Sequence, residues 1–145
     1  PHELLSSMQN KSLTLTANDL GAIINEFSLH SLYFQKAYLR GNIFLALHYA
    51  NILHGYYLRL MHYYLNKDRA KLGLKDLEKH LSPERAKEII ALTKLIKYDT
   101  ILIGVKTITV AMQEAIVNLP ISETMHIDYD FFLYAKKEIF SIDEE

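Results

Sequence analysis

The segment from Leu39 to Asn66 gathers three histidines and five tyrosines, which are side chains that bind metals, exchange protons or line ligand pockets. Read as a helix of about 100° per residue, the segment has a broad apolar arc and one narrow polar strip. The strip consists of His48, Asn51, Gly55, Arg59 and His62, with His54 at its apolar edge. The spacing of these residues decides which chemistry the helix can serve.

Spacing argues against a metal site in this helix. A helix holds a metal ion best through ligands at positions i and i+3 or i+4, and no two of its histidines are so spaced. The helix also carries no carboxylate that could complete a ligand set. We therefore predict no metal ligands in this helix. We also predict no catalytic residues, because the chain has neither a Gly-rich phosphate loop nor a G-x-S-x-G motif.

Ligand binding suits the strip better. Glycine inside a helix costs about 1 kcal/mol relative to alanine, so Gly55 indicates either close helix packing or space kept for a ligand. Tyrosines combine apolar area with a polar tip, and core packing is the alternative role for each of them. We expect the strip to border a cavity or groove. The candidate substrate-binding residues are His48, Asn51, His54, Gly55, Tyr57, Arg59 and His62.

Composition places these residues in one globular domain. The chain has 145 residues, of which 50% are hydrophobic and 23% are charged, and its formal net charge is −1. This balance indicates neither a nucleic-acid partner nor a membrane surface, and no apolar run reaches the ~18 residues of a membrane span. Cysteine is absent, which favours a cytoplasmic location. Because the chain opens with Pro1-His2, we interpret residues 1–145 as the C-terminal part of a larger two-domain protein.

Helices account for nearly the whole chain. Start signals occur at Thr16-Ala17-Asn18-Asp19, at Ser82-Pro83 and at Asp128, and Arg40-Gly41-Asn42 separates two long periodic segments. A further helix is expected over Tyr98–Asn118, and a short one over residues 2–9. No strand signal competes with these patterns. The predicted fold is all-α: an up-and-down antiparallel bundle of about four long helices with short terminal helices.

The expected helix Tyr98–Asn118 is apolar on two sides. Its main face suits a bundle core, and a second seam of Ile103, Val110 and Val117 repeats every seven residues on the other side. Such a helix is either central in the bundle or partly covered by a partner. We expect protein to bury the seam, either within the bundle, through a second copy or through a missing domain.

The order of these features resembles the C-terminal helical domain of antibiotic nucleotidyltransferases, most closely the lincosamide type. The resemblance runs from about Leu5 to Ile116 and rests on a few short motifs. They are Leu15-Thr16 before the first long helix, Arg40-Gly41 at the tight turn, Lys75-x-Leu77-Glu78-Lys79 and the helix begun by Ser82. The second long helix departs from the family in its many tyrosines and histidines.

The resemblance implies a specific role. In such enzymes, catalytic residues, Mg²⁺ and a nucleoside triphosphate belong to an N-terminal domain, and the helical domain helps to bind the acceptor and often joins in dimerisation. This chain would then be the acceptor-binding and dimerisation domain of an enzyme that modifies a hydroxylated small molecule such as an aminoglycoside or lincosamide. It would not be catalytic alone and would contain no cofactor. The alternative is a non-enzymatic bundle that binds a small ligand or a protein partner.

Overall fold

The computed structural model describes residues 14–65, 67–72, 74–75 and 77–144, and this part of the chain is helical without strands. Its α-helices are α2 (Ala17–Leu39), α3 (Ile43–Leu65), α4 (Pro83–Thr93), α5 (Ile101–Val117) and α6 (Tyr129–Phe140). Three short 3₁₀ helices connect them: η1 (Lys67–Leu72), η2 (Leu77–His80) and η3 (Ile121–Glu123). The predicted all-α class is confirmed, whereas the helix expected over residues 2–9 lies outside the described residues.

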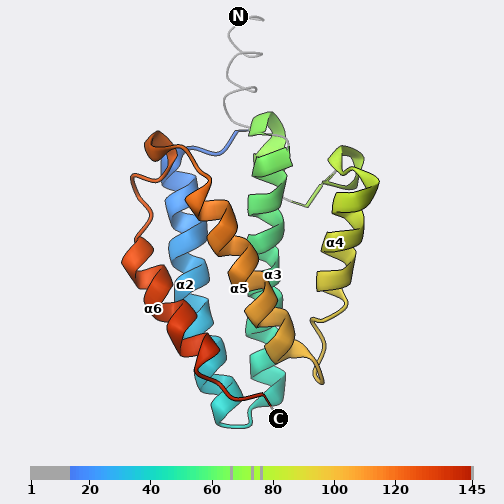
Figure 1. Ribbon diagram of the computed structural model, residues 1–145, viewed down its shortest axis with the longest axis vertical. Coiled ribbons are helices and arrows are strands. Elements are labelled where there is room, and N and C mark those ends of the chain that lie inside the picture. Colours follow the sequence, from blue (N-terminus) through green and yellow to red (C-terminus); the bar gives the residue numbers. More distant parts are fainter. Residues whose placement is uncertain (1–13, 66, 73, 76, 145) are drawn as a thin grey trace, which may run out of the picture.

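Successive α-helices run in opposite directions, as predicted for an up-and-down bundle (Figure 1). Helices α2, α3, α5 and α6 form the bundle proper, in which α2 packs against α3 and α6, and α5 packs against the same two helices. Helix α4 stands to one side and packs against α5 (Figure 1). Because α4 lies outside the four-helix bundle, α3 and α5 are neighbours and run in the same direction.

Local signals start the helices where the sequence predicts. At α2, the Asp19 N–H donates to the Thr16 hydroxyl at 3.1 Å, and the Thr16 N–H donates to the Asp19 carboxylate at 2.9 Å. The Ser82 hydroxyl accepts a hydrogen bond from the Arg85 N–H ahead of α4, and the Asp128 carboxylate accepts one from the Phe131 N–H ahead of α6. Each predicted cap is therefore confirmed.

The turn between α2 and α3 is built on Gly41, which has a φ of 74°. The Asn42 N–H donates to the Ala37 carbonyl at 2.9 Å, and the Gly41 N–H donates to the Tyr38 carbonyl at 3.1 Å. This pair of bonds is the Schellman arrangement that ends a helix at a left-handed residue, for which glycine is suited. The turn sets α2 and α3 side by side as antiparallel neighbours.

The core fills the space between the four bundle helices. Its largest fully buried side chains come from all four of them and include Phe27, Phe34, Leu53, Leu60, Ile108, Met112, Phe132 and Ile139. The main apolar face predicted for α5 is buried as expected. The second seam faces away from the described bundle, because Ile103, Val110 and Val117 are 46%, 39% and 61% exposed. None of the described helices is both long and apolar enough to span a bilayer.

Candidate functional site

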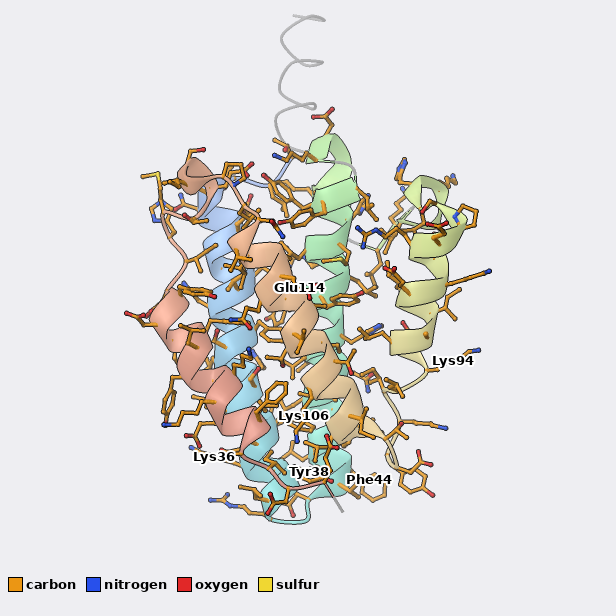
Figure 2. All side chains as sticks on the ribbon, in the orientation of Figure 1. Lys36, Tyr38, Phe44, Lys94, Lys106 and Glu114 are labelled. Atoms are coloured by element: carbon orange, nitrogen blue, oxygen red, sulfur yellow. The ribbon has the colours of Figure 1, made fainter. Side chains whose placement is uncertain are left out.

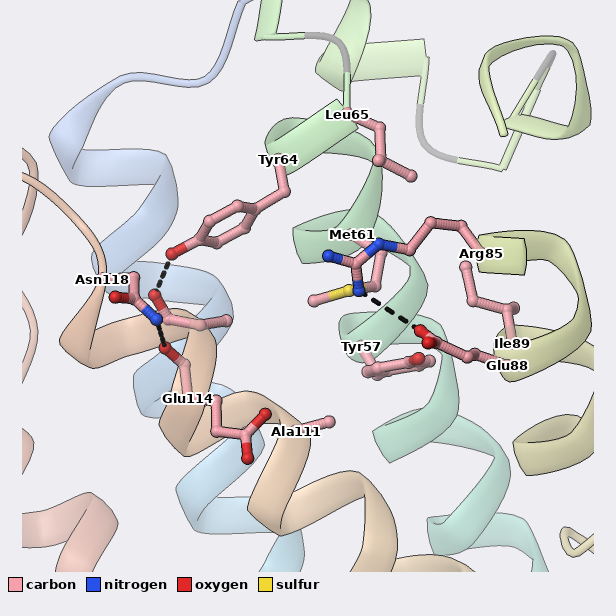
Figure 3. A pocket seen from close by; sticks show the side chains of 11 residues that line it. Tyr57, Met61, Tyr64, Leu65, Arg85, Glu88, Ile89, Ala111, Glu114 and Asn118 are labelled. Atoms are coloured by element: carbon pink, nitrogen blue, oxygen red, sulfur yellow. Dashed lines mark hydrogen bonds and ion pairs between the residues drawn. The ribbon is translucent and has the colours of Figure 1, made fainter. Parts of the chain in front are cut away.

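A cleft separates α4 from α3 and α5 and has a volume of about 230 Å³ (Figure 3). Helix α3 lines it with Tyr57, Met61, Tyr64 and Leu65, α4 with Arg85, Glu88 and Ile89, and α5 with Ala111, Glu114, Ala115 and Asn118. Apolar side chains from all three helices line the cleft, and polar groups of α4 and α5 border it. The cleft therefore combines an apolar surface with a few hydrogen-bonding groups, as ligand sites do.

Helix α4 contacts α3 and α5 near its C-terminal end and stands away from them along the rest of its length, which leaves the cleft. A Cβ atom on Gly104 would lie 2.9 Å from the Ile96 Cδ1 atom and 3.0 Å from the Leu95 carbonyl oxygen, so α5 packs closely on the α4–α5 connection. The His54 Nε2 atom lies 2.9 Å from the Thr93 hydroxyl, which joins α3 to the last residue of α4. The cleft opens beside the first half of α4, away from these two contacts.

Several donors in the cleft are already engaged by the protein. The Tyr64 hydroxyl donates to the Ala115 carbonyl, and the Asn118 amide donates to the Glu114 carbonyl at 2.8 Å (Figure 3). The Arg85 guanidinium donates to the Glu88 carboxylate at 3.2 Å. These bonds occupy the donor groups of the cleft. The Glu114 carboxylate remains available to accept hydrogen bonds from a ligand.

The Glu114 side chain is an exposed acceptor at the border of the cleft. Its carboxylate forms no hydrogen bond or ion pair with any residue that the structure describes, while Glu88 shares its charge with Arg85. One cation and two carboxylates leave the lining with an excess negative charge. Burial, and secondarily the Glu88 carboxylate, raises the pKa of Tyr57, so that phenol stays neutral. The cleft is therefore suited to a ligand that donates hydrogen bonds and carries a positive charge.

Only Tyr57 among the predicted substrate-binding residues lines this cleft. His48 and Asn51 are exposed on α3, and the Asn51 amide donates to the Leu47 carbonyl of its own helix. Asn51 also borders a separate apolar groove of about 520 Å³, whose other lining residues are Ile43, Phe44, Leu47, Ile96, Lys97 and Tyr98. The predicted strip thus does not form one continuous wall of the cleft.

The remaining predicted residues have different surroundings. His54 is half-buried between α3 and α4, where burial lowers its pKa and favours the neutral ring. Arg59 is half-buried on the same helix. His62 is fully buried, and its ring centroid lies 5.8 Å from that of His80 in η2. A segment distant in sequence therefore covers the end of the strip, which helical periodicity alone could not reveal.

Gly55 occupies open space. A Cβ atom built on it would meet nothing within 4 Å among atoms outside its own helix, so close helix packing does not explain this glycine. We expect Gly55→Ala to raise the free energy of unfolding by about 1 kcal/mol, because alanine restricts the unfolded chain more than glycine does. Chemical denaturation monitored by circular dichroism measures the change. A loss of stability would show that a neighbouring group does approach Gly55.

Sequence reasoning missed most of the cleft. Glu88 has the pattern of a solvated surface residue, and Glu114 lies within the outer face of α5 without any local motif. The sequence carries one signal of the cleft, which is the pair of small residues Ala111 and Ala115 four positions apart on α5. That signal gains meaning only once α4 is known to stand apart from the bundle.

The residues that the structure describes contain no group of three or more histidine, aspartate or glutamate side chains that could hold a metal ion. Comparison of the chain with protein-family models, with curated proteins and with solved structures finds no match.

Proposed function

We propose that this chain is a small-molecule-binding helical domain, and that the cleft between α3, α4 and α5 is its binding site. The observation that carries the proposal is the lining itself, an apolar surface with a free carboxylate from Glu114 at its border. Pockets that enclose a drug-sized ligand measure about 300–1,000 Å³, and this cleft is smaller at about 230 Å³. It would therefore hold one ring or branch of a ligand, with the rest of the molecule outside.

The charge of the lining defines the ligand class. A protonated amine could pair with Glu114 and donate to the Tyr57 or Tyr64 hydroxyl oxygen, while its hydrocarbon part covers Met61 and Ala111. An anionic ligand would face the unpaired carboxylate and would have to displace Arg85 from Glu88. The proposed ligand is therefore an amphipathic amine.

The resemblance to antibiotic nucleotidyltransferases supports a more specific role. We infer that the chain acts as the acceptor-binding domain of such a transferase in the cytoplasm, because a lincosamide combines a protonatable amine and an alkyl part with several hydroxyl groups. The nucleoside triphosphate and Mg²⁺ would belong to a separate catalytic domain, and the cleft's carboxylates do not form a metal-holding group. The 145-residue chain alone is expected to bind acceptors without transferring a nucleotidyl group to them.

The exposed seam on α5 supports a protein partner. Ile103, Val110 and Val117 form a row of apolar side chains, and burying such side chains fully is worth roughly 1.5–3 kcal/mol each. We infer that the catalytic domain or a second copy of the chain covers this row. The alternative role, a non-enzymatic bundle that binds a small ligand or a protein, requires the same cleft and seam without the transferase domain.

Titration with an aminoglycoside and a lincosamide tests the proposal. We expect Glu114→Gln to weaken binding of the lincosamide by about fivefold, as for loss of an exposed ion pair. Ala111→Phe should abolish binding because the larger ring fills the cleft. Isothermal titration calorimetry measures both effects.

Glu84→Gln is the matched control. It changes the net charge as much as Glu114→Gln does, but Glu84 is an exposed residue of α4 that does not line the cleft. Equal affinity of all three variants and the original chain would rule out the cleft as the binding site. Absence of binding by every amine tried, at millimolar concentration, would count against the amine class.

A further inference from the structure

A second groove lies at the opposite end of α3, where α2 turns into it. It has a volume of about 150 Å³ and is lined by Tyr33, Lys36, Ala37 and Arg40 of the α2 end, by Asn42 of the turn, and by Leu45 and Tyr49 of α3. Figure 2 shows Lys36 on the lower part of α2, near the turn. The cleft described above borders the other end of α3, so the two sites share no residue.

The charged groups of this groove are all cations. Lys36 lies in the last turn of α2 and Arg40 is its C-cap residue, and no carboxylate lines the groove with them. Like charges at this spacing repel each other slightly, whereas the helix dipole favours each cation at the C-terminal end of α2. Neither cation forms an ion pair with a residue in the described part of the chain, and the Glu144 carboxylate is paired with Lys106 at 3.2 Å.

The other polar side chains of the groove add donors. The hydroxyls of Tyr33 and Tyr49 and the side-chain amide of Asn42 have no hydrogen-bond partner among the described residues. Together with the ammonium and the guanidinium, they form a set of five side chains that can all donate. The groove therefore offers hydrogen-bond donors to a ligand, whereas the cleft offers an acceptor.

The backbone of the turn determines where these residues lie. Gly41 and the Schellman bonds to Ala37 and Tyr38 determine how α2 ends, and therefore where Arg40 and Asn42 lie relative to Lys36. The rings of Tyr33 and Tyr49 lie 5.5 Å apart between centroids and pack α2 against α3 just above the turn. The groove is thus built on the hydrogen-bonded turn between α2 and α3.

We propose that this groove binds the phosphate group of a small phosphate monoester. Lys36 and Arg40 would contact the phosphate oxygens, since guanidinium groups can donate two parallel hydrogen bonds to such an anion. The organic part of the ligand would lie against the exposed edge of Tyr33 and against Tyr49. Free phosphate shares the charged part of this chemistry but lacks the part that would contact the rings.

Titration of the chain with inorganic phosphate and with phenyl phosphate, at constant ionic strength, tests the proposal. We expect both to bind saturably, with phenyl phosphate the tighter ligand, and to shift the backbone amide NMR signals of Tyr33, Arg40 and Asn42. Lys36→Gln and Arg40→Gln should each weaken both ligands by about fivefold. Tyr33→Leu should weaken phenyl phosphate alone.

Lys94→Gln serves as the control, because Lys94 is an exposed cation at the end of α4 and outside the groove. It should leave both affinities unchanged, and circular dichroism should show that every variant is folded. The proposal would be overturned if Lys94→Gln weakened binding as much as Lys36→Gln did, if the shifted signals lay elsewhere, or if neither ligand saturated. If inorganic phosphate bound more tightly than phenyl phosphate, the proposal that the groove prefers a phosphate monoester would be contradicted.

Discussion

Replacing Phe27 with alanine is expected to lower the free energy of unfolding by about 3–5 kcal/mol. Phe27 is 1% exposed in the centre of α2, and its ring lies 6.1 Å from that of Phe132 in α6 between centroids. The substitution removes a buried ring and leaves a cavity that the rigid surroundings fill only in part. Urea denaturation at several protein concentrations measures the loss.

Phe44→Ala supplies the matched control. Phe44 is 88% exposed at the start of α3, so the same chemical change should alter stability by less than about 0.5 kcal/mol. A comparable loss at both positions would show that Phe44 is covered in solution, either by a second copy or by another part of the protein. A small loss at Phe27 would contradict the bundle core itself.

Much of the fold could be predicted because its signals are local. Thr16 and Asp19 are three residues apart, as are Ser82 and Arg85, and each pair determines a helix start regardless of the rest of the chain. Gly41 likewise ends α2 through bonds that span at most five residues. A chain whose helices are delimited in this way, with short connections, has few alternatives to an up-and-down bundle.

The site was less accessible to prediction because it depends on distant parts of the chain. The polar strip of α3 is one surface only if nothing covers it, yet η2 brings His80 over His62. Tyr57 faces the cleft because α4 stands apart from α3. The distance between these two helices cannot be predicted from the sequence pattern of α3 alone. Helical periodicity gives the direction of a side chain from its own axis, whereas a pocket requires the position of the neighbouring helix as well.

The two proposed sites have complementary charge. The cleft by Glu114 offers acceptors, and the groove by Lys36 and Arg40 offers donors, although the chain as a whole has a formal net charge of only −1. A near-neutral protein can thus select ligands of either sign, because the local lining, and not the net charge, determines which ligand is desolvated favourably.

Replacing Gly21 with alanine should destabilise the protein, in contrast to the gain expected at Gly55. A Cβ atom on Gly21 would lie 2.6 Å from the His126 carbonyl oxygen, 2.7 Å from its Cβ atom and 2.9 Å from its carbonyl carbon. None of these atoms can rotate away, so the segment that leads into α6 would have to move. Movement would strain the hydrogen bonds from the Asn25 amide to the His126 carbonyl and from the Asp128 N–H to Asn25.

The pair of alanine substitutions separates the steric effect from helix propensity. Both glycines lie inside long helices, so alanine should contribute the same gain of about 1 kcal/mol at each position. Crowding in a close-packed region costs typically 1–3 kcal/mol, and contacts with backbone atoms place Gly21 near or above the upper limit of that range. We therefore expect Gly21→Ala to be about 3 kcal/mol less stable than Gly55→Ala when both are compared by urea denaturation. Equal stability of the two variants would mean that α2 does not pack against residue 126, and α6 would then have to be placed differently against α2.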